Sequence, residues 1–136
     1  MIKQNESYFK SKIKKLLKAM GFWVYSPRDI IRSGIPDLIC CRTGMFFGIE
    51  IKKETAKMKY NITPLQELNL KAINDRGGYS IVLILCNSVE QYLLQNHVNG
   101  YFELFINVNK ICINIIEDAI NKILVIPISM NDNKLL

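Results

Sequence analysis

The sequence predicts an α/β fold in which a central mixed sheet is flanked by helices. Two short apolar segments joined by a tight turn predict an antiparallel hairpin over residues 38–53. A capped helical segment and then a continuous apolar run, over residues 63–85, predict a helix followed by a buried strand. Strands that alternate with helices in this way are typical of layers of helices packed on one sheet.

The size and composition are those of one compact cytoplasmic domain. The chain has 136 residues, of which 49% are hydrophobic and 22% are charged, so it has enough apolar material for a core. The N-terminus has no secretory signal, and the apolar runs are too short to span a bilayer. We therefore expect a soluble protein that is not associated with a membrane.

The first elements are a helix and a short strand. Residues 5–20 place apolar side chains at helical spacing, and lysines occupy much of the remaining surface. Glu6 falls on the apolar stripe, where it either complements the helix dipole or points into a site. Gly21 ends this helix, and residues 22–25 are expected to form a strand before the polar loop 27–35.

The middle of the chain contains the hairpin, a helix and a buried strand. The hairpin strands are Leu38–Cys41 and Phe46–Lys53. Thr63-Pro64-Leu65-Gln66 is a capping box with proline at the first helical position, and its helix should end near Asp75, before Gly77-Gly78. A continuous apolar strand follows over residues 79–85, and Ser88 is expected to cap a further helix over residues 89–96.

The isoleucine-rich residues 101–130 allow two interpretations. Ile111, Ile115, Ala119 and Ile123 have helical spacing, whereas residues 124–128 resemble an edge strand limited by Pro127. We therefore describe residues 1–99 as the main domain. Residues 100–136 are an extension that either packs on this domain or forms a dimer interface.

Asp37, Glu50 and Lys52 are the candidate catalytic residues. Side chains alternate along a strand, so Glu50 and Lys52 project from one face, and an antiparallel hairpin brings Asp37 beside them. Two carboxylates, with the backbone carbonyl of Ile51, form a ligand set for Mg²⁺ or Mn²⁺, and the lysine can stabilise a phosphate. This chemistry is that of phosphodiester hydrolysis.

Each of these residues also has a simpler interpretation. Asp37 follows a proline and is compatible with an ordinary turn, and Glu50 with Lys52 is compatible with a solvated edge strand. The strand that carries Glu50 is otherwise apolar, however, so an acid and a lysine on it favour a site.

The charge distribution indicates nucleic acid as the partner. Residues 1–59 carry thirteen Lys or Arg and five Asp or Glu, a net charge of +8, whereas residues 60–136 have a net charge of −2. Contacts between lysine or arginine and the phosphate backbone are independent of base sequence and weaken with salt. Candidate DNA-binding residues border the carboxylates in the sequence: Arg28, Arg32, Ser33, Lys53, Lys57 and Lys59.

These motifs resemble a known family of nucleases. Pro36-Asp37 followed by Glu50-Ile51-Lys52 resembles the PD-(D/E)XK nuclease superfamily. With Glu6, Ser33-Gly34-Ile35, Gln66 and Gly77-Gly78, the pattern over residues 5–86 is similar to its virus-type replication-repair (VRR-NUC) branch, often a small stand-alone phage protein.

The resemblance implies a restriction-endonuclease-like core and a metal-dependent nuclease that cuts branched DNA such as Holliday junctions. It also implies that Glu6 and Gln66 join Asp37, Glu50 and Lys52 in the active site, and that the protein is a homodimer. Three alternatives remain: a restriction-type or replication-linked nuclease, a non-catalytic DNA-binding module of the same fold, and a structural protein in which the motif is accidental.

Overall fold

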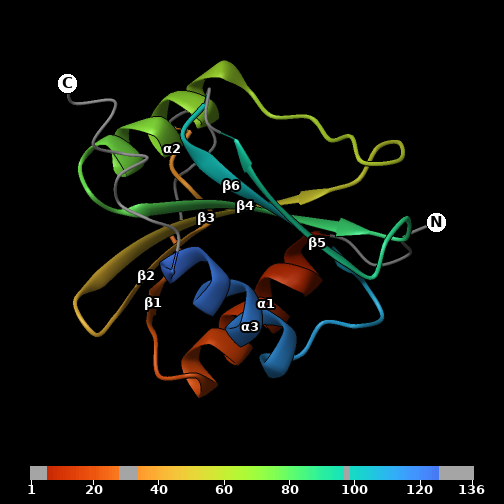
Figure 1. The fold of residues 1–136 in the computed structure, drawn as a ribbon, viewed down its shortest axis with the longest axis horizontal. Helices are drawn as coiled ribbons and strands as arrows, with labels where there is room; N and C mark the ends of the chain where they lie inside the picture. Colours follow the sequence, from red (N-terminus) through yellow and green to blue (C-terminus); the bar gives the residue numbers. More distant parts are fainter. Residues whose placement is uncertain (1–5, 28–33, 97–98, 126–136) are drawn as a thin grey trace.

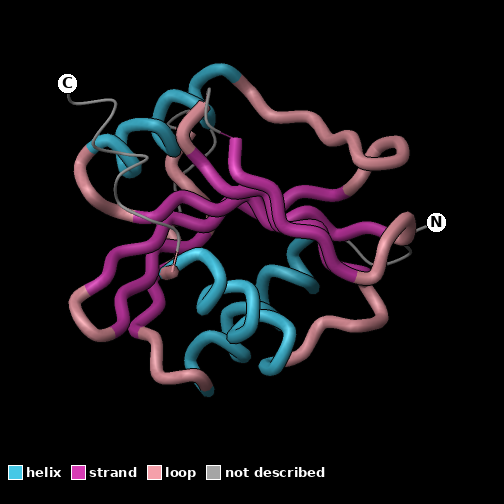
Figure 2. Tube along the Cα trace, viewed as in Figure 1, coloured by secondary structure: helices cyan, strands magenta, loops and turns pink. Residues whose placement is uncertain are grey.

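The computed structural model describes residues 6–27, 34–96 and 99–125, and in them one six-stranded mixed sheet carries three helices (Figures 1 and 2). The elements in chain order are α1 (Glu6–Ala19), β1 (Trp23–Tyr25), β2 (Leu38–Arg42), β3 (Met45–Lys53), α2 (Pro64–Asp75), β4 (Tyr79–Cys86), β5 (Gln91–Asn96), β6 (Tyr101–Asn107) and α3 (Ile113–Leu124). The predicted α/β fold with a mixed sheet is confirmed.

The sheet has the strand order β1-β2-β3-β4-β6-β5. β3, β4 and β6 are parallel to one another, whereas β2 pairs antiparallel with β3 and β5 pairs antiparallel with β6. The parallel connection from β3 to β4 passes through α2, as such crossovers require a long segment. β6, the last strand among the described residues, lies between β4 and β5.

The helices cover both faces of the sheet (Figure 1). α1 and α3 pack on one face, where Phe9, Ile13 and Ile120 join the larger core cluster. α2 packs on the other face, where Leu70 belongs to a smaller cluster. Along β3, alternate side chains are directed to the two faces, so Phe47, Ile49 and Ile51 face α1 and α3.

A two-residue turn sets the register of the hairpin. Thr43 and Gly44 both have positive φ, 51° and 79°, which is the requirement of the type I′ turn that matches the twist of a hairpin. The register therefore pairs Leu38 with Ile49, as the sequence predicts for strands joined at this turn. The next pair in this register places Asp37 opposite Glu50.

The sequence-based prediction of a helix over residues 89–96 is wrong. Gln91–Asn96 is strand β5, because Leu93 packs on the larger core while Tyr92 and Leu94 are exposed, an alternation with period two. The Ser88 hydroxyl does not cap a helix but donates a hydrogen bond to the carboxylate of Glu54.

The C-terminal region is part of the same sheet and core. Tyr101–Asn107 forms β6, and the helical interpretation is confirmed by α3 for Ile115, Ala119 and Ile123, whereas Ile111 lies before the helix. Leu124 ends that helix, and residues 126–128 of the alternative edge strand lie outside the described residues. How the chain divides into domains stays a prediction. No described helix is long and apolar enough to cross a membrane.

Candidate active site

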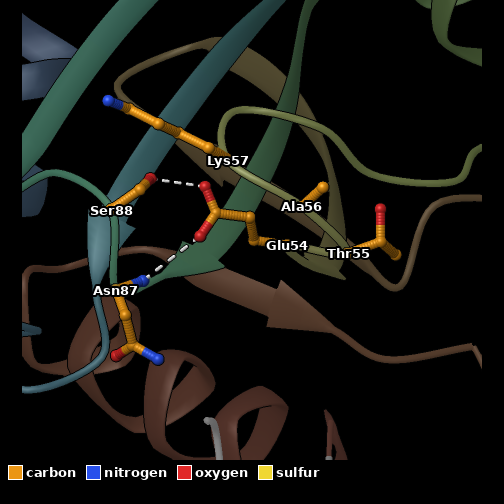
Figure 3. Close-up of a pocket in the computed structure, with 6 residues that line it drawn as sticks. All are labelled: Glu54, Thr55, Ala56, Lys57, Asn87 and Ser88. Atoms are coloured by element: carbon orange, nitrogen blue, oxygen red, sulfur yellow. Dashed lines mark hydrogen bonds between the residues drawn. The ribbon is translucent and has the colours of Figure 1, made fainter.

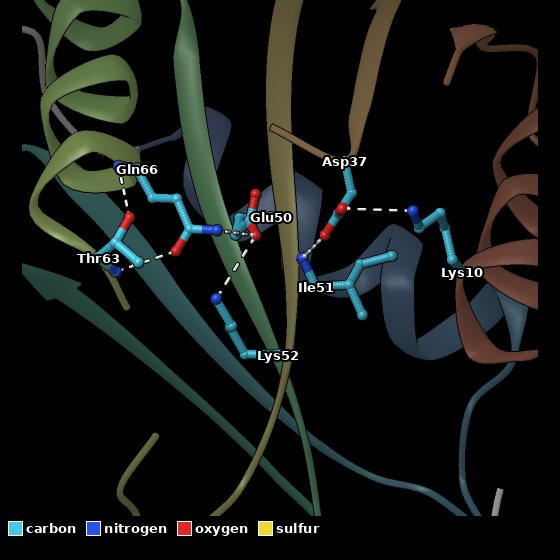
Figure 4. Close-up of polar contacts among 7 residues, drawn as sticks. All are labelled: Lys10, Asp37, Glu50, Ile51, Lys52, Thr63 and Gln66. Atoms are coloured by element: carbon cyan, nitrogen blue, oxygen red, sulfur yellow. Dashed lines mark hydrogen bonds and ion pairs between the residues drawn. The ribbon is translucent and has the colours of Figure 1, made fainter. Parts of the chain in front are cut away.

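Asp37 lies directly before β2 and is buried beside β3. Its Oδ2 atom accepts a hydrogen bond of 2.9 Å from the backbone N–H of Ile51. Its Oδ1 atom lies 3.4 Å from the Nζ atom of Lys10, which reaches it from α1 (Figure 4). The carboxylate is thus held at the start of β2 by the strand beside it and by the first helix.

Pro36 accounts for the way Asp37 replaces the normal strand pairing at this point. Hydrogen-bonded pairs alternate along the hairpin, and counting from the two-residue turn, Leu38 and Ile49 form one of them. In the same register Pro36 would face Ile51, but proline has no N–H to donate. The Ile51 N–H binds the Asp37 carboxylate instead, and the Ile51 carbonyl points to the same side without a donor from Pro36.

Glu50 is buried on the α2 face of the sheet, with only 4% of its surface exposed. Its Oε2 atom accepts a hydrogen bond of 3.0 Å from Nε2 of Gln66 and lies 3.7 Å from Nζ of Lys52 (Figure 4). Glu50 and Lys52 project from the same face of β3, as the alternation of the sequence predicts. The predicted grouping of these side chains is therefore present in the structure.

Gln66 has two partners because it lies at the third position of α2. Its side-chain Oε1 atom accepts a hydrogen bond of 3.0 Å from the backbone N–H of Thr63. Its backbone N–H donates a hydrogen bond of 3.1 Å to Oγ1 of Thr63. This confirms the predicted capping box. The amide nitrogen at the other end of the same side chain contacts Glu50, so the cap fixes the direction of that contact.

The electrostatics of the site are dominated by two neighbouring carboxylates. Burial first, and the negative charge of Asp37 second, raise the pKa of Glu50 to about 8, although the Lys52 ammonium acts in the opposite direction. Lys10 and Lys52 are the cations nearest to these acids among the described ion pairs. Each carboxylate thus has an ammonium group beside it, in a place from which most water is excluded.

Gly34, in the segment before Asp37, packs closely against the start of α2. Its φ is +67°, and an added Cβ would lie 2.9 Å from the backbone carbon and oxygen of Leu65. Any side chain at this position would force the two segments apart. This contact places the chain leading to Asp37 directly against the helical turn that carries Gln66.

The donor atoms fit a hard divalent cation. Asp37, Glu50 and the Ile51 carbonyl offer oxygen ligands, which Mg²⁺ and Mn²⁺ prefer. Two buried carboxylates so close that one raises the pKa of the other are a favourable place for such an ion, which would offset their repulsion. The described residues contain no group of three or more His, Cys, Asp or Glu side chains that could hold a metal, so water and phosphate would complete the coordination.

The other predicted site residues lie in different places. Glu6 is the first residue of α1 and is exposed, one helical turn before Lys10, and no hydrogen bond or ion pair joins it to the described residues of the site. Lys53 follows Lys52 and is directed to the opposite face of the sheet. Lys57 and Lys59 are exposed in the connector after β3. Arg28, Arg32 and Ser33 lie outside the described residues.

A hollow of about 470 Å³, away from Asp37 and Glu50, lies beyond the ends of β3 and β4 (Figure 3). Glu54 holds its wall together by accepting hydrogen bonds from the Ser88 hydroxyl and the backbone N–H groups of Met58 and Asn87. Burial alone would raise the pKa of Glu54, but these hydrogen bonds outweigh it and lower the pKa. The carboxylate is fully used in fixing the connector that follows β3.

Lys10 is the site residue that the sequence did not indicate. It belongs to a run of lysines on the first helix that reads as a solvated surface. One signal was available, because Lys10 lies four residues after Glu6 and therefore on the same side of the helix.

In comparisons with known proteins, no family model and no curated protein sequence matches this chain.

Proposed function

We propose that this chain is a divalent-metal-dependent endodeoxyribonuclease that hydrolyses branched DNA. The observation that carries the proposal is the meeting of Asp37, Glu50, Lys52 and Gln66 from three different elements at one buried place in the sheet. Together with the resemblance of the motifs, this favours a restriction-endonuclease-like core of the VRR-NUC type.

The residues have distinct roles in this proposal. Asp37, Glu50 and the Ile51 carbonyl would hold Mg²⁺ or Mn²⁺, which supplies a more acidic water and neutralises charge on the phosphate. Lys52 would stabilise the negative charge that develops on the phosphate oxygens, since its ammonium lies beside Glu50 and remains partly exposed. Gln66 would orient Glu50. Glu6, at the start of α1 and one helical turn from Lys10, would be a further catalytic carboxylate.

The charge of the chain indicates DNA as the partner, and junction cleavage calls for two active sites. The basic first half of the chain would bind the DNA backbone, with Arg28, Arg32, Ser33, Lys53, Lys57 and Lys59 as the contacts. A homodimer would present two equivalent clefts to the two strands that junction resolution must cut. Such an enzyme would act in the cytoplasm, that of the host cell in the case of a phage protein.

A non-catalytic DNA-binding module is the second candidate function. Two buried carboxylates with a half-buried lysine beside them cost stability unless they hold a metal, so their presence favours the enzyme. A restriction-type or replication-linked nuclease on the same core would instead cut linear duplex at a defined sequence.

Cleavage assays with four-way junction, flap, single-stranded and duplex DNA test the proposal. Hydrolysis should require Mg²⁺ or Mn²⁺ and stop in EDTA. Asp37→Asn, Glu50→Gln and Lys52→Met should each lower the rate by about a hundredfold or more while DNA binding persists. Lys122→Met is a charge-matched control on α3, where the lysine is exposed and pairs with Asp118. Full activity of Glu50→Gln would contradict the mechanism.

A further inference from the structure

The edge strand β1 exposes a pair of aromatic side chains. Trp23 is 63% exposed and Tyr25 is 51% exposed. Their rings are stacked, with centroids 6.2 Å apart and planes 15° from parallel. Val24, between them in the sequence, packs against the larger core, so the two rings share the opposite face of the sheet.

That face is the one that carries Glu50 and Lys52. Val24 on β1 and Ile51 on β3 both pack on the core beneath α1 and α3, so Tyr25 and Glu50 lie on the other side. Tyr25 pairs with Ile39, which pairs with Gly48, two residues before Glu50. Tyr25 is therefore about 10 Å across the sheet and about 7 Å along it from the candidate active site.

We propose that Trp23 and Tyr25 form a stacking surface for unpaired bases of the DNA substrate, a proposal that rests on the proposed nuclease function. Two exposed, nearly parallel rings beside a phosphate site are suited to bases, because every base presents a flat aromatic face. The strand belongs to the half of the chain with a net charge of +8, which complements a DNA backbone.

A second copy of the chain is a less suitable occupant. An aromatic side chain offers at most roughly 250 Å², and Trp23 and Tyr25 are only 63% and 51% exposed, whereas a stable interface buries roughly 800 Å² per partner. β1 also has only three residues, too few for extended strand addition at this edge. The surface has the size of one or two bases.

The consequence concerns the substrate class. Fully paired duplex has its bases stacked on one another and offers no face to these rings. A flap, a gap or the open centre of a junction offers unpaired bases close to the bond to be cut. The pair would therefore favour DNA that is single-stranded next to the cleaved phosphate.

Trp23 is the only tryptophan in the chain, so its fluorescence reports on this surface alone. The experiment uses the Asp37→Asn protein in EDTA, in which binding is separated from hydrolysis. A single-stranded oligodeoxynucleotide and a flap substrate should quench the emission, and a blunt duplex of the same sequence should change it little. Absence of quenching by the single strand would overturn the proposal.

Variants provide the second measurement. Tyr25→Leu and Trp23→Leu should each weaken binding of the flap substrate by about tenfold and leave duplex binding unchanged. Tyr92→Leu is the matched control, because Tyr92 is 47% exposed on β5, at the opposite edge of the same face, and should have no effect. If Trp23→Leu does not fold, Tyr25→Leu still carries the test, since it keeps Trp23 as the reporter.

Two results would contradict the stacking surface in different ways. Unchanged flap affinity in Tyr25→Leu would show that the rings do not bind the substrate. The nuclease proposal would be unaffected, because metal-dependent cleavage tests it separately. A fall in mass from dimer to monomer in Trp23→Leu, measured by light scattering, would show that the rings belong to a subunit interface. Quenching without any metal-dependent cleavage would instead contradict the nuclease and support a DNA-binding module.

Discussion

Gln66 connects the first turn of α2 to Glu50 through the two ends of one amide group. The oxygen caps the helix and the nitrogen binds the carboxylate, so the structural and catalytic roles of this residue need to be separated. Thr63→Ala removes the hydroxyl that accepts the Gln66 backbone N–H and leaves both contacts of the Gln66 amide possible, whereas Gln66→Ala removes both contacts of that amide.

We expect the two variants to lose similar stability but different activity. Each should lower the free energy of unfolding by about 1 kcal/mol, the usual value of a helix cap. Gln66→Ala should in addition lower the turnover at least tenfold, as a displaced Glu50 would do. Urea denaturation and turnover of both proteins check this, and equal activities would reduce Gln66 to a cap.

Lys10 partly balances the charge of Asp37 in the absence of a metal. Lys10→Gln should therefore lower the melting temperature of the metal-free protein by about 4 °C, the equivalent of roughly 1 kcal/mol. Because the lysine competes with a cation for the carboxylate, Mg²⁺ should raise the melting temperature of the variant more than that of the parent protein. Thermal melts with Mg²⁺ and with EDTA measure both effects.

Lys15→Gln is the control for this change, since Lys15 is exposed on the same helix and the charge difference is equal. An equal Mg²⁺ response in Lys10→Gln and Lys15→Gln would show that Lys10 has no influence on the cation.

Individual site residues were predictable where a strand or a cap dictates their direction. Alternation along β3 determines the shared face of Glu50 and Lys52, and the capping box determines the position of Gln66. The approach of Lys10 to Asp37 depends on how α1 packs across the sheet. No local pattern in the helix contains that information.

At the scale of elements, Arg42 ties the end of β2 to α3. Its guanidinium binds both carboxylate oxygens of Glu117, at 3.0 and 2.7 Å, and donates to the Met20 carbonyl at 3.0 Å. It also lies 4.4 Å from the centre of the Phe22 ring. One side chain thus connects α1, the hairpin and the last helix.

This ion pair makes a pH-dependent contribution to stability. The hydrogen bonds from Arg42 lower the pKa of Glu117 below its ordinary value of 4.5 in the folded protein. The contribution is therefore complete above that value and is lost as the pH falls below it. Glu117→Gln should cost about 1 kcal/mol at neutral pH, and the difference from the parent protein should shrink near pH 3. Urea denaturation across this range measures it.

Asp118→Asn is the neighbouring control, because Asp118 is exposed and pairs with Lys122 one turn along the same helix. A cost of Glu117→Gln that does not change with pH would mean that packing, and not the charge, gives Glu117 its effect.

The elements that the sequence predicted correctly are those with a strong local signal. The hairpin follows from Thr43-Gly44, and α2 follows from its cap and its proline. β5 was mistaken for a helix because Ser88 resembles a cap, whereas the pairing with β6 decides its conformation. β6 was not predicted, because its nearly continuous apolar run has no period that distinguishes a strand from a helix, and its neighbour β5 was itself taken for a helix.

At the scale of the whole molecule, the isoleucines of the C-terminal region are largely buried within one chain. Such a series predicts exposed apolar surface for a partner, and it comprises Ile106, Ile111, Ile113, Ile115, Ile116, Ile120, Ile123 and Ile126. Among the described members, Ile113 is exposed, Ile115 is partly buried, and the others belong to the core beneath the sheet. The case for a homodimer therefore rests on the need for two clefts.

We still expect a homodimer, because resolution of a junction requires two symmetric cuts. Light scattering at micromolar concentration should give twice the chain mass of 15.7 kDa without DNA, and this mass plus that of the DNA when a four-way junction is bound. A monomeric mass in both conditions, together with paired cuts in the junction, would rule out the dimer.

The insertion of β6 between β4 and β5 also has a consequence for the order in which the protein is made. On the ribosome, strands β1 to β5 emerge before β6, which pairs with both β4 and β5. The apolar edge of β4 is therefore unpaired until β6 has been made. Until about residue 107 has left the exit tunnel, β1 to β4 can pair with one another, but β4 lacks its neighbour β6. A pause in translation at this point would leave an open, apolar strand edge, the kind of surface that chaperones bind and that neighbouring nascent chains can join.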